Sequence, residues 1–172
     1  MKIQKFTLAI LFLLFISQTL FSQEFTIPKN VTLKSDSDYK KYENDVLQGI
    51  NWLENTPINQ QVAKRKKVSA FLLQWMTGTP SFSIKMQSFQ MELTEKNPDL
   101  LISFLGGWAK YALENPADKD NELAANIAGF ESLIKVYTSN KENGIKKDKK
   151  VEKLAKLDKT GLEKWVRKKL GQ

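Results

Sequence analysis

Hydrophobic and polar residues alternate with a helical period along most of the chain. From about residue 35 onward, apolar side chains recur every three or four positions, the spacing that gathers them on one face of an α-helix. The predicted helices span residues 36–55, 56–78, 86–93, 98–114 and 119–139, and two short basic helices follow near 151–157 and 160–170. The pattern therefore predicts an all-α domain over 35–172, a single compact bundle of six or seven helices.

Local signals mark several of the predicted helix ends. Thr56 is expected to cap the second helix, with Pro57 at its first position. Thr160 and Glu163 have the spacing of a capping box, which predicts that the last helix begins there. Residues 81–86 alternate apolar and polar side chains, so a short strand is an alternative to irregular structure at this place.

The segment 98–114 is apolar on nearly every side, which predicts a central helix that the other helices surround. Small residues form a stripe along it, and small residues also lie one turn apart on the following helix. In an antiparallel pair we expect Gly106 to face Gly129. We expect Ala109 to face Ala125 in the same way. Such a contact would bring the two helices closer than the usual 8–10 Å.

A ligand site is the alternative explanation of these small residues. Small side chains beside aromatic rings also shape pockets for small molecules. On this hypothesis, a small apolar ligand binds in a cleft lined by Trp75, Trp108 and Tyr111.

The N-terminal residues follow the three-part pattern of a secretory signal peptide over 1–22. A short basic start precedes an apolar run over 6–16, and small polar residues follow. The run is shorter than the roughly 18 residues that a membrane-spanning helix needs. We expect cleavage after Ser22, with an uncleaved N-terminal anchor as the alternative. Residues 23–34 are then expected to form an extended arm ahead of the helical domain.

The chain contains no histidine and no cysteine. The usual acid–base group at neutral pH and the commonest metal ligands are therefore missing, and we predict no metal site, no cofactor and no catalytic residues. A histidine-free hydrolase is the remote alternative. It would use a serine with a lysine, as in Ser83 and Lys85, or the carboxylates of Glu92 and Glu95. We expect all four side chains to be solvated surface positions instead.

Positive charge is concentrated at the C-terminal end. Of the 27 lysine and arginine residues, 12 lie in the basic tail, residues 141–172, together with 5 of the 19 acidic residues. In the last helix, basic and apolar side chains are mixed, which predicts contact with an anionic surface. The candidate contacts are Lys164, Arg167, Lys168 and Lys169. The alternative is a helix that docks its apolar stripe on the core while its lysines face solvent.

Three stretches of the sequence carry a resemblance to known proteins. They are WLENTP (52–57), FLLQWMTGTPSFSI (71–84) and FLGGWAKYALEN (104–115). Together with the leader ending in FSQ, they resemble small exported all-helical proteins of Gram-negative Bacteroidota, a group without an assigned activity. The resemblance implies an exported helical domain and carries over no catalytic residues.

These observations together favour binding over catalysis. We predict an exported helical binding domain, periplasmic or secreted, that is not an integral membrane protein once its signal peptide is cleaved. The expected partner is another envelope protein or a small apolar ligand, and an anionic envelope surface is the alternative. Nucleic acid is not expected, because the chain is predicted to be exported and lysine greatly outnumbers arginine in the basic tail.

Overall fold

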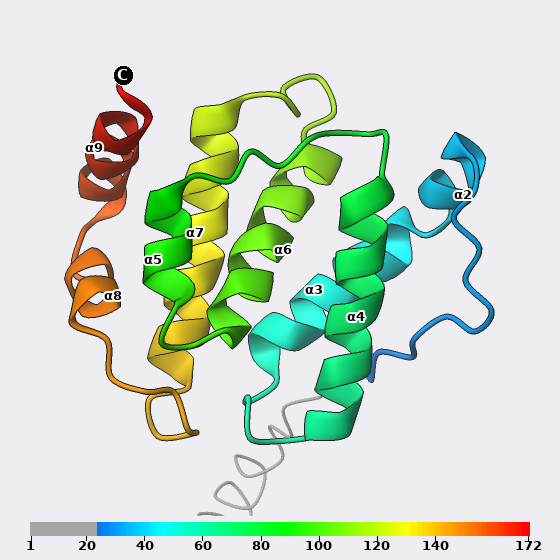
Figure 1. Ribbon diagram of the computed structural model, residues 1–172, viewed down its shortest axis with the longest axis horizontal. Helices are drawn as coiled ribbons and strands as arrows, with labels where there is room; N and C mark the ends of the chain where they lie inside the picture. Colours follow the sequence, from blue (N-terminus) through cyan, green and yellow to red (C-terminus); the bar gives the residue numbers. More distant parts are fainter. Residues whose placement is uncertain (1–23) are drawn as a thin grey trace, which may run out of the picture.

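The computed structural model describes residues 24–172, and the regular secondary structure of this part of the chain is all α-helix, as predicted. The eight helices of this part are labelled as in Figure 1: α2 (Asp36–Lys41), α3 (Glu43–Asn55), α4 (Val62–Gly78), α5 (Ser88–Thr94), α6 (Asp99–Glu114), α7 (Glu122–Ser139), α8 (Lys149–Leu154) and α9 (Lys159–Leu170). The predicted signal peptide, residues 1–22, lies outside the described residues. No helix within 24–172 has the length and apolar character needed to cross a bilayer.

The helices α6 and α7 lie side by side in the middle of the molecule (Figure 1). Helices α3 and α4 pack on one side of this pair, and α5, α8 and α9 lie on the other. The described part of the arm, residues 24–34, has no helix or strand, and its Phe25 side chain is buried beside Gly49 of α3. Helix α6 has neighbours on several sides because its apolar residues cover most of its circumference.

The close approach of α6 to α7 is made by Gly107 and not by Gly106. A Cβ atom at Gly107 would lie 2.5 Å from the carbonyl oxygen of Ala128 and 2.9 Å from the Cα atom of Gly129. The predicted pairing of Gly106 with Gly129 is therefore wrong. Gly106 faces Ile50 of α3, whose Cγ2 atom would be 3.2 Å from an added Cβ. One residue turns a helix by about 100°, so neighbouring glycines serve different contacts.

Two predicted helix starts also differ from the structure. Thr56 ends α3 instead of opening the next helix, and residues 57–61 form a loop in which the Ile58 N–H donates to Asn140 Oδ1 at 2.9 Å. This tertiary contact outweighs the local preference of Thr56 and Pro57 for starting a helix. In α9, the cap is Asp158, whose Oδ1 atom accepts from the Gly161 N–H at 2.7 Å, so Thr160 already lies inside the helix.

Two further segments depart from the simple helical pattern. The predicted first helix is divided at Tyr42, which ends α2 and opens α3. Residues 81–86 form no strand within 24–172, so the strand alternative is wrong. The segment is nevertheless anchored, because Phe82 is buried and its ring lies 6.0 Å from that of Trp75.

Candidate functional site

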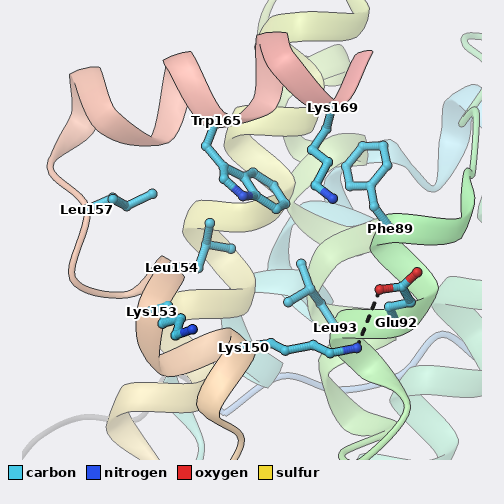
Figure 2. A pocket seen from close by; sticks show the side chains of 9 residues that line it. All are labelled: Phe89, Glu92, Leu93, Lys150, Lys153, Leu154, Leu157, Trp165 and Lys169. Carbon is cyan, nitrogen blue, oxygen red and sulfur yellow. Dashed lines mark hydrogen bonds and ion pairs between the residues drawn. The ribbon is translucent and has the colours of Figure 1, made fainter. Parts of the chain in front are cut away.

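A partly open groove lies between α5, α8 and α9. Figure 2 shows side chains from these three helices converging on it, in front of α7. Its volume is about 350 Å³, near the lower end of the range for small-molecule sites, roughly 300–1,000 Å³. We call it the α5–α8–α9 groove; it is lined by Phe89, Glu92, Leu93, Lys150, Lys153, Leu154, Leu157, Trp165 and Lys169.

The upper wall of the groove is an aromatic cluster anchored in the core. The ring of Trp165 lies 5.8 Å from Phe89 of α5 and 5.2 Å from Phe130 of α7, in near-perpendicular arrangements at 76° and 88°. Leu162 and Val166 of α9 are buried on either side of Trp165 in the sequence. Helix α9 is therefore fixed against α5 and α7, and the indole keeps one partly exposed side toward the groove.

Buried amides hold α5 in place below the groove. Gln90 is fully buried, its Oε1 accepts from the Gln87 N–H at 2.8 Å, and its Nε2 donates to Asn126 Oδ1 at 2.9 Å. This link fixes α5 on α7, because an unpaired amide would be costly in the core. The groove-lining side chains of Phe89 and Leu93 are thereby positioned on a rigid element.

The approach to α8 is fixed by a second set of buried polar groups. Asn97 Nδ2 donates to the Lys146 carbonyl at 2.9 Å, and the Lys146 N–H donates to Asn97 Oδ1 at 2.8 Å. The Asp148 N–H donates to the Tyr137 hydroxyl at 2.9 Å. Helix α8 consequently presents Leu154 to the groove from a backbone that is tied at two points.

The rim of the groove is basic. Lys150 forms an ion pair with Glu92 at 3.4 Å, which joins α8 to α5 across the lower end of the groove in Figure 2. Lys153 also lies on α8, and Lys169 extends from α9 with its Nζ 5.7 Å from the centre of the Trp165 ring. Neither Lys153 nor Lys169 takes part in an ion pair within residues 24–172.

The aromatic cleft proposed from the sequence does not fit the structure. Trp75 and Trp108 are 0% and 2% exposed and belong to the core, so their rings face other apolar side chains. Tyr111 is only half-buried, and its hydroxyl donates to the Asp118 carboxylate in the α6–α7 connection. This bond, with smaller contributions from burial and the Asp118 charge, raises the pKa of Tyr111 to about 12. The three side chains do not form one ligand site.

The four basic residues of α9 that were predicted to contact an anionic surface have different surroundings. Arg167 pairs with Glu163 one turn earlier, its Nη2 2.8 Å from Glu163 Oε1, whereas Lys164 and Lys168 are exposed. Of the four, Lys169 lines the groove. The apolar stripe of α9 packs against the core, with Leu162 and Val166 buried and Trp165 and Leu170 partly buried.

The carboxylates considered for catalysis are not arranged as a reaction centre. Glu92 and Glu95 are both exposed on or beside α5. Glu54 is a buried carboxylate that the sequence pattern does not reveal, and it is engaged by the Ser132 hydroxyl at 2.7 Å and by Lys135 at 3.0 Å. Within residues 24–172, no cluster of three potential acidic, histidine or cysteine ligands could hold a metal ion.

Comparison with known proteins gives no independent assignment of this site. The chain matches no protein-family profile, and neither the curated proteins nor the solved structures contain a match.

Proposed function

We propose that this protein is an exported binding protein of the cell envelope whose ligand site is the α5–α8–α9 groove. The observation that carries the proposal is a cavity of about 350 Å³ with apolar walls and lysines at its mouth. Most small-molecule sites combine such an apolar lining with a few polar groups that orient the ligand. The proposal keeps the class of function expected from the sequence and moves the site from the core tryptophans to the groove.

The exposed apolar surface in the groove supports a ligand. Leu157 is 40% exposed at the groove edge, and the half-buried Trp165 lies above it. Transferring one methylene from water to such a surface contributes about 0.8 kcal/mol, so a short aliphatic chain supplies measurable affinity. The fixed positions of the three helices reduce the ordering cost of binding.

Tryptophan fluorescence tests this proposal directly. Of the four tryptophans, Trp52, Trp75 and Trp108 are buried, so a ligand in the groove should change mainly the emission of Trp165. We expect saturable emission changes with decanol, and their loss in Trp165→Phe.

Paired leucine variants locate the site. Leu157→Ser should weaken decanol binding several-fold, whereas Leu73→Ser, at an exposed leucine of α4 outside the groove, should not. Equal effects of the two variants, or an absence of any saturable signal, would contradict a binding site in the groove.

The exposed lysines of α9 favour a second candidate function, electrostatic contact with an anionic envelope surface. Lys164 and Lys168 are exposed, and the apolar stripe beneath them is occupied by the core. Any contact is thus made through charge and weakens as salt is added. The double variant Lys164→Gln, Lys168→Gln should lower cosedimentation with phosphatidylglycerol vesicles at low salt. Unchanged cosedimentation would exclude this function for α9.

We also propose that the protein is exported. Residues 1–22 would then be a signal peptide, 23–34 an arm and 35–172 the helical domain, in line with the resemblance to exported helical proteins of Bacteroidota. N-terminal sequencing of the protein from cell-envelope and culture fractions should give Gln23 as the first residue. A protein that retains Met1 and stays in the cytoplasm would contradict export.

A further inference from the structure

The ligand class follows from the charges around the α5–α8–α9 groove. The lining contains three lysines and one glutamate. The glutamate, Glu92, is already compensated by Lys150 at 3.4 Å. The remaining charge at the mouth is therefore positive, carried by Lys153 and Lys169. A neutral ligand would make no use of this charge, and a cation would be repelled by it.

Lys169 is the best-placed of these charges. Its ammonium group lies near the Trp165 ring, 5.7 Å from the ring centre, at the point where the aromatic wall meets solvent (Figure 2). A cation over an aromatic face is held there by the ring quadrupole. An anionic head group bound to Lys169 would leave the rest of its molecule free to lie along Trp165 and Leu154.

We propose, on the basis of the function proposed above, that the groove binds a single-chain amphiphilic anion. The ligand is an aliphatic carboxylate of medium length, with its carboxylate on Lys169, assisted by Lys153, and its chain over the apolar floor. The chain supplies most of the affinity, because each buried methylene contributes more than a solvent-exposed ion pair does on average. The lysines supply the preference for an anion over a neutral molecule of equal length.

The Lys150–Glu92 pair weakens the binding of an anion in the groove. The Glu92 carboxylate lies at the lower end of the same groove and repels a bound carboxylate. Its ion pair with Lys150 also compensates the positive charge that Lys150 would otherwise offer to the ligand. Both partners are more than half exposed, so the pair contributes little to folding and can be changed without unfolding α5 or α8. Removing the Glu92 charge should therefore strengthen anion binding.

Decanoate and decanol, both as monomers, test the proposal through the Trp165 fluorescence signal. We expect decanoate to bind several-fold more tightly than decanol at low salt, with the difference shrinking at high salt. Lys169→Gln should remove most of this preference, weakening decanoate binding more than decanol binding. Lys168→Gln is the matched control, because it removes the same charge from the preceding residue of α9, which does not line the groove.

Glu92→Gln should increase decanoate affinity several-fold and change decanol affinity less. Each outcome has a defined meaning. Equal binding of decanol and decanoate, or equal effects of the substitutions at Lys168 and Lys169, overturns the anion assignment and leaves the groove as a site for neutral ligands. Absence of binding by both probes overturns the groove as a site, and with it the assignment of its ligand.

Discussion

At the residue scale, two neighbouring glycines of α6 do different things. A Cβ atom at Gly107 would meet the backbone of α7, whereas the nearest atoms to one at Gly106 belong to the side chain of Ile50 on α3. A side chain can shift by a few tenths of an ångström, but the backbone of a packed helix cannot do so cheaply. The cost of a methyl group should therefore differ sharply between the two positions.

Gly107→Ala should destabilise the protein by about 1–2 kcal/mol. Overpacking costs roughly 1–3 kcal/mol, and the better helix propensity of alanine returns up to about 1 kcal/mol of it. Gly106→Ala has the same gain in helix propensity, and the neighbouring Ile50 side chain can shift. Its unfolding free energy should therefore stay within about 1 kcal/mol of that of the parent chain. Urea denaturation of the two variants measures the difference, and a Gly107→Ala variant as stable as Gly106→Ala would refute the backbone contact.

Arg65 is a buried cation whose partners are backbone carbonyls. Its guanidinium donates to the carbonyl oxygens of Leu53, at 3.2 Å, and of Thr56 at the end of α3. Burial lowers the pKa of Arg65, but a guanidinium remains protonated in a folded protein. The side chain thus satisfies carbonyl groups that the last turn of a helix leaves without intrahelical donors.

Arg65→Met should cost roughly 1.5–3 kcal/mol, because the buried carbonyls lose a charged donor while the apolar volume is largely kept. Lys66→Met is the control, since Lys66 is the next residue of α4 and is exposed. Its effect on urea denaturation should stay within about 0.5 kcal/mol. Similar losses in both variants would show that Arg65 does not stabilise the end of α3.

At the element scale, the α6–α7 connection is organised around one carboxylate. Asp118 accepts from the Tyr111 hydroxyl and from Asn121 Nδ2 at 3.0 Å, and Asn121 in turn caps α7 by accepting from the Ala124 N–H at 3.1 Å. The hydroxyl bond exists only while the tyrosine is protonated. Its contribution to stability is therefore complete below the ordinary tyrosine pKa of about 10 and is lost as the pH rises toward 12.

Asp118→Asn should lower the pKa of Tyr111 toward the ordinary value. The variant loses the negative charge and the strong acceptor that oppose formation of tyrosinate. Ultraviolet absorbance of tyrosinate during an alkaline titration measures the change. Asp120→Asn removes the same charge from an exposed neighbour in the connection and should leave the titration unaltered. A titration of the Asp118→Asn variant identical to that of the parent chain would contradict this hydrogen bond.

The elements also show which features the sequence could predict. Periodicity locates the long helices, because an apolar stripe is a local property of the chain. The phase of α6 cannot be read from the sequence to within one residue, since Gly107 has no side chain to show which face it belongs to. Trp75 and Trp165 are equally apolar in the sequence, and only tertiary packing decides that the first is buried and the second borders a groove.

At the scale of the whole molecule, the basic tail is an integral part of the fold. Its buried residues Val151, Leu154, Leu162 and Val166 belong to the same core as α6 and α7. The groove is formed by segments near residues 90, 150 and 165, so no local pattern could have predicted it. Deleting residues 141–172 would expose core side chains, and charge substitutions are for this reason the better test of surface binding.

The pair of hydrogen bonds between Asn97 and Lys146 should couple the tail to the rest of the fold. Asn97→Ala leaves the N–H and carbonyl of Lys146 without these partners, which should cost about 1–3 kcal/mol. Because the bonds lie at the start of the segment that leads to α8, hydrogen exchange should accelerate more in α8 and α9 than in α3. Lys96→Ala alters the same turn at an exposed position and should leave exchange unchanged. If α8 and α9 keep the parent protection in Asn97→Ala, their position depends on the aromatic contacts of Trp165 and not on this link.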